Sequence, residues 1–251
     1  MGNIETRFLC DYRRLYELRV CENHRKVWSK MNRIKDLYSK YKHAIPLLVF
    51  FIIYMSWFTW LERDVTQYQV IHVALDDYIP FCEVFIVPYL LWFVYVAAVV
   101  VFLMLKNKQD YYKACTFLMT GMTIFLIVST LWPNGHHLRP TVLPRDNIFS
   151  DLVAMLWRTD TPTNLWPSIH VYNSMGAHFA VMHSNNLPHK KGIRIASFLL
   201  MVSIILSTML LKQHSVFDVV TGLLLGGAMY ILVYRREWIF APKTQRTPQH
   251  Y

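Results

Sequence analysis

The sequence of 251 residues has few charged side chains, few cysteines and little glycine or proline. Charged residues make up 17% of it, against roughly 25% in an average soluble domain, so a soluble protein is disfavoured. Four cysteines without a C-x-x-C pair exclude a disulfide scaffold, and 8 glycines with 11 prolines exclude a collagen-like or linker-rich chain. Apolar residues are abundant, at 54%, and this excludes intrinsic disorder.

The apolar residues gather in six windows, each long enough, or nearly so, to cross a hydrocarbon core about 30 Å thick. We therefore predict an all-α polytopic membrane protein with six transmembrane helices. The window 167–183 is the most polar, and a surface or re-entrant segment is the alternative for it. Lys212 and Gln213 alone separate the last two windows, which indicates a hairpin of two tightly packed helices. The windows are 43–61, 84–105, 113–132, 167–183, 193–211 and 214–234.

Two basic segments flank this predicted membrane domain of residues 43–234. Residues 1–42 carry a net charge of +6 and apolar side chains at roughly helical spacing, which favours an amphipathic helix lying on the membrane. A partly disordered basic tail is the alternative. A cleavable signal peptide does not begin with a long basic arm of this kind, so we expect no signal peptide. Residues 235–251 form a basic tail with a net charge of +3.

The charge of the loops between the windows predicts the orientation. Residues 106–113 and 184–194 carry +2 and +3, like the basic termini, whereas residues 62–83 carry −4 and residues 133–166 are neutral. Lys and Arg are retained on the cytoplasmic side of membranes. We therefore predict a multi-pass protein of the cell membrane with both termini cytoplasmic, and with the loops 62–83 and 133–166 and the turn 212–213 outside. The net charge of +10 then reflects the orientation of the chain in the membrane and contact with anionic lipids. It does not indicate nucleic-acid binding, since no nucleic-acid-binding motif is present.

Three polar clusters fall on the predicted outer side, at Asn134–Pro140, Trp166–His170 and Ser207–Asp218. Ionisable residues are costly in a membrane and are usually functional. Each cluster also has a structural alternative: a lone histidine often serves helix packing, Asp218 can cap a helix, and Arg139 can anchor at the interface. The convergence of all three on one side favours a functional site.

Two of these clusters contain groups suited to nucleophilic chemistry and anion binding. His214 and Asp218 are four residues apart and would share one helix face. The carboxylate could then hold one ring nitrogen of the imidazole and leave the other basic. Ser168 stands close to the backbone N–H groups of a predicted helix start, which is a natural anion site, and His170 lies about one turn inside it.

Two cations complete the set. Arg139 offers a planar fork of donors suited to phosphate, and Lys212 lies close to His214 as a fixed positive charge. A nucleophile, an acid and an anion cradle together fit phosphoryl transfer. The many histidines also allow a metal site, but adjacent His136 and His137 would point in different directions on a helix, and no H-E-x-x-H occurs. We therefore expect no metal and no cofactor.

These clusters resemble the motifs K-x6-R-P, P-S-x-H and S-R-x5-H-x3-D of the type 2 phosphatidic acid phosphatase (PAP2) superfamily, which includes vanadium haloperoxidases. The resemblance covers residues 113–234 and implies a PAP2-like helical bundle. Trp132 stands where the motif has Lys, Thr208 where it has Arg, and Ile169 where many members have Gly. The run S-T-x4-K-Q-H-x3-D looks closest to the inositol phosphorylceramide synthase-like subgroup. The matching stretches are Arg139-Pro140, Pro167-Ser168-Ile169-His170 and Ser207-x6-His214-x3-Asp218.

The resemblance implies a role for each matching residue. His214 would be the nucleophile that forms a phosphohistidine, and Asp218 would orient it. His170 would be the general acid for the leaving alcohol and then the base for the acceptor. The family's chemistry needs no metal. The groups that would hold phosphate oxygens are Arg139, Ser168, Lys212 and Ser207.

The leading hypothesis is a membrane lipid phosphatase that hydrolyses a lipid phosphomonoester or diphosphate at the outer face. The alternative enzyme is a lipid phosphotransferase that passes a phospho-head group to an alcohol. A transporter or a non-catalytic membrane scaffold is a third hypothesis, opposed by the scarcity of charge in the middle of the windows. The expected partners are the membrane and a lipid phosphate, and the sequence names no protein partner.

Two outer segments have open interpretations. Residues 141–165 are expected to form either an amphipathic lid over the site or a plain solvated loop. Residues 62–83 contain Asp76, Asp77 and Glu83, and their default interpretation is a solvated acidic face; a rim of the site is the alternative.

Overall fold

The computed structural model describes residues 28, 30–33, 35–36, 38–64, 67–187 and 190–235. The chain divides into two compact units, residues 1–46 and residues 47–251. In the first unit the described residues from 28 to 41 are helical, and η1 (Lys42–Ala44) and the first two residues of α2 (Ile45–Asp64) follow. Most of the predicted arm 1–42 and almost all of the tail 235–251 lie outside the described residues, so both assignments stay predictions.

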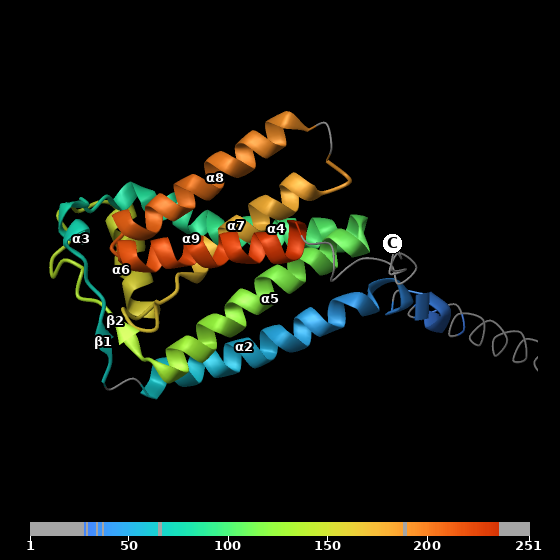
Figure 1. Cartoon of the computed structure of the whole chain (residues 1–251), viewed down its shortest axis with the longest axis horizontal. Helices are drawn as coiled ribbons and strands as arrows, with labels where there is room; N and C mark the ends of the chain where they lie inside the picture. Colours follow the sequence, from blue (N-terminus) through green and yellow to red (C-terminus); the bar gives the residue numbers. More distant parts are fainter. Residues whose placement is uncertain are drawn as a thin grey trace, which may run out of the picture. The chain divides into compact units, whose positions relative to one another are not determined.

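The second unit is mainly helical, as the sequence predicts (Figure 1). In the described part of the chain, a single short sheet pairs β1 (Gln69–Val70) with β2 (Asn134–Gly135) in parallel. The helices after α2 are α3 (Ala74–Tyr78), η2 (Glu83–Phe85), α4 (Ile86–Lys106), α5 (Lys108–Leu131), α6 (Ile148–Thr159), α7 (Ile169–His183), α8 (Lys191–Leu210), α9 (Val216–Tyr230) and the π-helical η3 (Ile231–Arg235).

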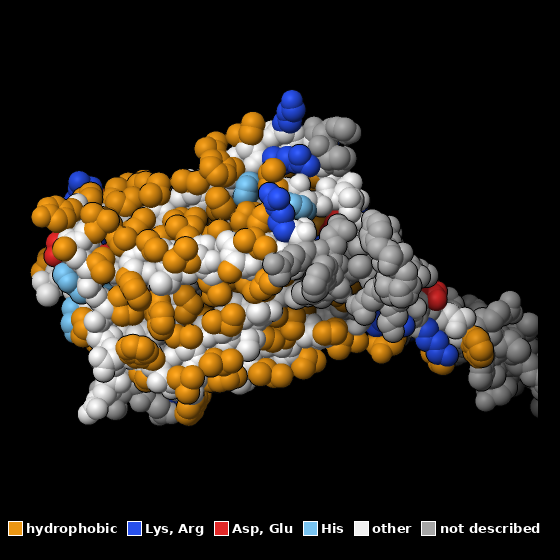
Figure 2. Space-filling view, in the orientation of Figure 1, with side chains coloured by type: hydrophobic (Ala, Val, Ile, Leu, Met, Phe, Trp, Pro, Cys, Tyr) orange, Lys and Arg blue, Asp and Glu red, His pale blue; other side chains and the backbone are white. Residues whose placement is uncertain are grey.

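Five of the described helices are long and apolar enough to cross a membrane. Large apolar side chains on them are exposed, and Figure 2 shows hydrophobic side chains covering the visible sides of the helices. Such surfaces suit contact with lipid, so the structure is that of an all-α membrane protein. The five segments are Lys30–Arg63, Glu83–Lys106, Lys108–Leu131, Lys191–Leu210 and Val216–Arg235.

α7 corresponds to the sixth predicted span and differs from the other five. It has 15 residues, which reach about 22 Å, less than a hydrocarbon core of about 30 Å. The count of six spans is therefore not confirmed. α7 packs against α4, α5, α8 and α9, and its polar side chains His170, Asn173 and His178 are buried. These residues are polar because they face protein, so the alternative of a surface segment is wrong.

The core around α7 depends on close helix approach. The rings of Phe117 on α5 and Tyr172 on α7 stack with their centroids 4.6 Å apart. Gly121 lies beneath the ring of Tyr172, and a Cβ atom there would come within 2.0 Å of it. α8 and α9 are joined by the predicted short turn, but each packs mainly on α7 rather than tightly on the other.

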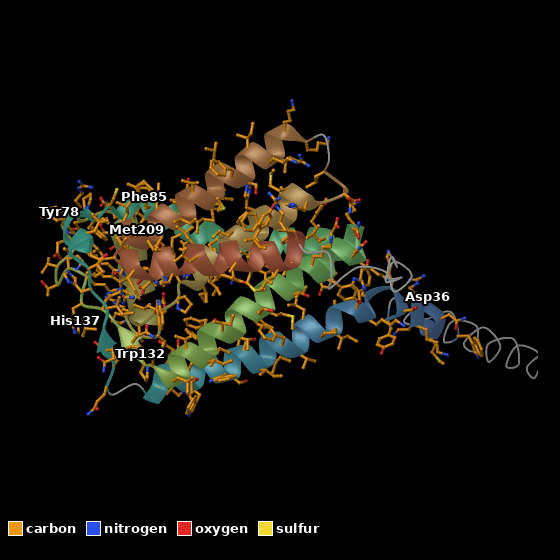
Figure 3. The ribbon with its side chains drawn as sticks, in the orientation of Figure 1. Asp36, Tyr78, Phe85, Trp132, His137 and Met209 are labelled. Carbon is orange, nitrogen blue, oxygen red and sulfur yellow. The ribbon has the colours of Figure 1, made fainter. Side chains whose placement is uncertain are left out.

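The three segments predicted to lie outside meet at one end of the helices. Besides the pairing of β1 with β2, Gly135 forms a bridge with Thr163, and Cys82 N–H donates to Leu210 O at 2.9 Å. A Cβ atom at position 135 would lie 2.6 Å from the carbonyl oxygen of Pro162, so only glycine fits there. Figure 3 shows Tyr78, His137 and Met209 at this end.

Residues 141–165 contain a helix, so a plain solvated loop is not what the structure shows there. Asn147 caps α6 by accepting hydrogen bonds from Phe149 N–H and Ser150 N–H, each at 3.0 Å. Val153 is fully buried, whereas Ile148 and Met155 are exposed. α6 is therefore amphipathic, as expected of a lid, and its action as a lid stays a prediction.

The interpretation of residues 62–83 as a solvated acidic face is wrong for two of its carboxylates. Asp76 and Glu83 are each only 2% exposed, whereas Asp77 is exposed. Glu83 accepts hydrogen bonds from Arg145 Nη1 at 3.0 Å and Asn147 Nδ2 at 3.1 Å. Buried carboxylates need such partners, and here they tie the segment to the end of the helices.

Candidate active site

The candidate site lies where the start of α7 meets the turn between α8 and α9. Nδ1 of His170 is 3.3 Å from Nε2 of His214, and Nδ1 of His214 is 3.4 Å from Oδ2 of Asp218. All three side chains are buried. One nitrogen of His214 thus faces a carboxylate while the other faces a second imidazole, as the sequence motifs require of a nucleophile beside an acid.

The contact between His214 and Asp218 does not come from a shared helix face, because α9 begins only at Val216. Ser215 is the N-cap of α9: its Oγ accepts from Phe217 N–H at 3.2 Å, and its own N–H donates to Asp218 Oδ2 at 3.0 Å. This capping box turns the carboxylate of Asp218 back toward Ser215, and so toward His214, the residue that precedes the cap. The predicted contact is present, but its predicted origin is wrong.

The turn that carries His214 is fixed by its own backbone. The carbonyl oxygen of Thr208 accepts from Gln213 N–H at 2.9 Å and from His214 N–H at 3.0 Å. Lys212 adopts a left-handed conformation with φ of 54°, which is uncommon for a residue other than glycine. The end of α8 therefore sets the place of the imidazole.

α7 is joined directly to α9 at the site. Ser168, the N-cap of α7, donates its N–H to the carbonyl oxygen of Asp218 at 3.3 Å, and its Oγ accepts from Val171 N–H at 3.4 Å. Gly222, one turn after Asp218, allows this approach: a Cβ atom there would lie 3.0 Å from the carbonyl oxygen of Ser168. The start of α7 and the first turn of α9 thus hold His170 and Asp218 together.

Aromatic side chains of α4 pack against His170. Its ring centroid is 4.8 Å from that of Tyr89 and 4.4 Å from that of Trp92. Both belong to an apolar run that, in the sequence, indicates only a membrane span. The structure adds them to the site as the surface that restricts the imidazole of His170.

Arg139 lies in a partly buried network next to the turn that carries His214. Its Nη2 donates to Oε1 of Gln213 and its Nη1 donates to the carbonyl oxygen of Trp157 at 3.2 Å. Nε2 of Gln213 donates to Oδ2 of Asp160 at 3.2 Å, and the hydroxyl of Tyr89 donates to the same oxygen at 3.2 Å. Burial raises the pKa of Asp160 to about 6, against the opposing effect of the positive charge of Arg139.

Burial also governs the charge of His214. It lowers the pKa of His214 to about 3, and the positive charge of Arg139 lowers it further in the same direction. The imidazole is therefore neutral at physiological pH, which a nucleophile requires.

His136 is a structural member of the first polar cluster. Its Nδ1 accepts from Leu138 N–H at 3.2 Å, so its Nε2 carries the proton and donates to the carbonyl oxygen of Gln213 at 2.9 Å. Burial lowers its pKa to about 4. With both nitrogens engaged, His136 holds the turn that carries His214, whereas His137 beside it is exposed.

Asp76 reaches the site from α3 in the loop 62–83. Its Oδ1 accepts from Val216 N–H at 2.7 Å, and its Oδ2 accepts from the hydroxyl of Ser215 at 2.7 Å and from Val73 N–H at 2.9 Å. A carboxylate at a helix N-terminus satisfies free N–H groups and favours the helix dipole. Asp76 thus holds the first turn of α9, which positions Asp218.

The remaining predicted phosphate ligands are held less directly. Nζ of Lys212 donates to the carbonyl oxygen of Asp76 at 2.8 Å, and burial lowers its pKa. The hydroxyl of Ser207 donates to Ile204 O at 2.6 Å within α8. The structure brings Arg139 and Ser168 next to the catalytic candidates, whereas it directs Lys212 and Ser207 to partners of their own.

The departures from the motifs also have a place in the structure. Trp132, at the motif Lys position, is 57% exposed at the end of α5. Thr208, at the motif Arg position, is fully buried, and its hydroxyl donates to Ile205 O at 2.7 Å. Among the residues that the structure describes, no three His, Cys, Asp or Glu side chains lie together as metal ligands would.

Residues 138–240 match the model of the PAP2 superfamily. The match supports the resemblance drawn from the motifs and indicates a lipid enzyme of the phosphatase or phosphotransferase type; it does not identify the inositol phosphorylceramide synthase-like subgroup. Comparisons with curated proteins and with solved structures found no match. The PAP2 segment contains Arg139, Ser168, His170, Ser207, Lys212, His214 and Asp218.

Proposed function

We propose that this PAP2-type protein is an integral membrane phosphatase that hydrolyses a lipid phosphomonoester or diphosphate through a phosphohistidine on His214. The observation that carries the proposal is the buried line of His170, His214 and Asp218, with distances of 3.3 and 3.4 Å between successive side chains. Such a line supplies a nucleophile, an acid beside it and a carboxylate that orients it.

In the first step, the lone pair on Nε2 of His214 attacks the phosphorus atom. The bond from phosphorus to the lipid oxygen breaks, its electron pair stays on that oxygen, and protonated His170 gives the oxygen a proton as the alcohol leaves. Asp218 stabilises the positive charge that develops on the imidazole of His214. The two imidazole nitrogens are 3.3 Å apart, so the rings have to separate to admit phosphorus between them.

In the second step, water attacks the phosphohistidine. Neutral His170 takes a proton from the water as its oxygen bonds to phosphorus. The bond between phosphorus and Nε2 breaks, its electron pair returns to His214, and phosphate leaves. Arg139 and the N–H groups at the start of α7, capped by Ser168, hold the phosphate oxygens. Ser207 and Lys212 would serve as further ligands only after leaving their present acceptors, Ile204 O and Asp76 O.

The site works at the extracytoplasmic face in this proposal. The loops that meet around it, 67–83 and 134–165, belong to the segments with negative or no net charge, and cytoplasmic loops are the ones enriched in Lys and Arg.

One observation favours a second candidate, transfer of a phospho-head group to an alcohol. Trp132 and Thr208 replace two motif cations, and Thr208 is buried without charge. A phosphodiester carries one negative charge, whereas a phosphomonoester carries roughly −1.5 to −2 at neutral pH. A site with fewer cations suits the diester, and an alcohol would replace water in the second step.

The first experiment measures phosphate release by the purified protein in detergent over a panel of lipid phosphates, with chelator present. We expect release that vanadate inhibits and that His214→Ala abolishes. His137→Ala is the matched control, because His137 lies at the same end of the helices but is exposed. Turnover retained in His214→Ala would refute both enzyme candidates.

Product analysis then separates the two candidates. Free phosphate as the main product supports hydrolysis, whereas a phosphorylated alcohol formed only when the acceptor is added supports transfer. Insensitivity to vanadate together with substrate flux in liposomes would instead indicate a transporter.

A further inference from the structure

We infer that Gln213 and Asp160 are positioning residues for Arg139, and that they hold its guanidinium so that its Nε–H is available to the substrate phosphate. The inference rests on the proposed function. Neither residue is a defining residue of the three motifs: Gln213 stands at a variable position just before His214, and Asp160 follows α6 in the same outer segment as Arg139.

The guanidinium of Arg139 is held from two sides. Nη2 donates to Oε1 of Gln213, Nη1 donates to the carbonyl oxygen of Trp157, and the guanidinium carbon lies 5.7 Å from the centroid of the Trp157 ring. Nε is buried and has no hydrogen-bond partner among the described residues. A buried N–H group without an acceptor is costly, so this one points to an acceptor supplied by a ligand.

Asp160 determines which end of the Gln213 amide faces Arg139. The amide of Gln213, only 1% exposed, donates through Nε2 to Oδ2 of Asp160 at 3.2 Å. An amide has one oxygen acceptor and one nitrogen donor, so this bond leaves Oε1 for the guanidinium. Without the carboxylate, the amide can rotate and present its NH₂ group to the cation, which it would repel.

The amide also keeps Arg139 available. A carboxylate in direct contact would form a bidentate ion pair with the guanidinium and compete with phosphate for the same donors. Gln213 places a neutral acceptor next to Arg139. The negatively charged Asp160 contacts Gln213 and not the guanidinium, so the amide lies between the two charges. Tyr89 donates to the same Asp160 oxygen at 3.2 Å and packs against His170, so the network also borders the proposed acid.

The test measures vanadate binding, both as inhibition of turnover and as a shift in thermal unfolding in detergent. Gln213→Leu removes the acceptor in a buried position, and Asp160→Ala removes its orienting partner. We expect each to weaken vanadate binding about 10- to 100-fold, the effect of a lost hydrogen bond to a charged group. Asp151→Ala on the exposed side of α6 is the matched control and should bind vanadate as the wild type does.

A double variant separates positioning from a general structural effect. If Gln213 acts through Arg139, Gln213→Leu combined with Arg139→Ala should bind vanadate no more weakly than Arg139→Ala alone. Additive losses would overturn the inference, as would wild-type vanadate binding in Gln213→Leu. If Gln213→Leu does not fold, the isosteric Gln213→Glu serves instead and should also weaken binding, because its carboxylate would neutralise Arg139.

The inference and the proposed function can fail separately. Vanadate binding with the expected non-additivity, but no turnover of any lipid phosphate, would refute the proposed function and leave the positioning role standing. Turnover that depends on His214, together with wild-type vanadate binding in Gln213→Leu and Asp160→Ala, would refute the positioning role alone. Absence of both vanadate binding and turnover in the wild type would refute both.

Discussion

Replacing Asp76 tests whether an outer loop controls the site through the first turn of α9. The carboxylate accepts three hydrogen bonds, from Val216 N–H, the Ser215 hydroxyl and Val73 N–H, at 2.7, 2.7 and 2.9 Å. Asp76→Asn keeps one oxygen but turns the other into an NH₂ group that cannot accept. At least one of these bonds is therefore lost, and a donor is left facing another donor.

The magnitude follows from these contacts. A hydrogen bond to a charged group contributes about 1.5–3 kcal/mol, and a carboxylate at a partly buried helix N-terminus adds up to about 2 kcal/mol. We expect Asp76→Asn to lower the free energy of unfolding by about 2–4 kcal/mol. Displacement of the turn moves His214 and Asp218 relative to the substrate, and a misplacement of about 1 Å can cost about 100-fold in rate. We therefore expect kcat to fall tenfold or more.

The assay compares kcat for phosphate release and the midpoint of thermal unfolding in detergent. Asp77→Asn is the matched control, because Asp77 is the next residue of α3 but its side chain is 65% exposed and pairs with His72 at the surface. A surface ion pair contributes at most about 1 kcal/mol, so the control should behave as the wild type. Equal kcat and equal unfolding midpoints in Asp76→Asn and Asp77→Asn would refute the anchoring role.

Two further predictions concern packing and pH. Gly121→Ala would place a Cβ atom 2.0 Å from the buried ring of Tyr172, so we expect thermal unfolding to show a loss of stability of about 1–3 kcal/mol or more. Gly227→Ala is the control and should be neutral or stabilising, because a Cβ atom there meets nothing within 4 Å. Equal effects of the two substitutions would contradict this prediction. Since Asp160 has a pKa of about 6 and its carboxylate holds the network of Arg139, kcat/KM should rise with pH through about 6 in the wild type relative to Asp160→Asn. The ionisation of the substrate is common to both proteins, so a constant ratio between pH 5 and 8 would contradict the role of the carboxylate.

Much of the fold and the centre of the site could be predicted from the sequence. Long apolar runs fix where helices cross a membrane, whatever their neighbours are, and five of the predicted spans appear as helices long enough to do so. The motif spacing also brings His170, His214 and Asp218 together. What periodicity could not show is that α7 is a short central helix, since its polar pattern depends on which helices surround it.

The residues that support the site could not be found in the same way. Tyr89 and Trp92 look like ordinary members of an apolar span, and Asp76 and Asp160 look like solvated loop carboxylates. Their roles arise from contacts between segments 53 to 140 residues apart. Among these supporting residues, Gln213 alone gives a hint of its role in the sequence, because it is an uncharged polar residue in the short turn just before His214.

The departures from the motifs and the network around Arg139 have one physical explanation. Trp132 and Thr208 replace two of the three motif cations, so Arg139 is the one that this sequence retains. Trp132 is exposed, and the hydroxyl of Thr208 donates to its own helix. The carbonyl oxygen of Trp157 and the amide of Gln213 each fix one Nη group of Arg139, which holds this cation in place for phosphate in the proposed function. A lysine could not contact both while still offering a third donor from a rigid plane. In the proposed function, α6 and the turn before α9 therefore orient Arg139, the motif cation that remains when positions 132 and 208 carry none.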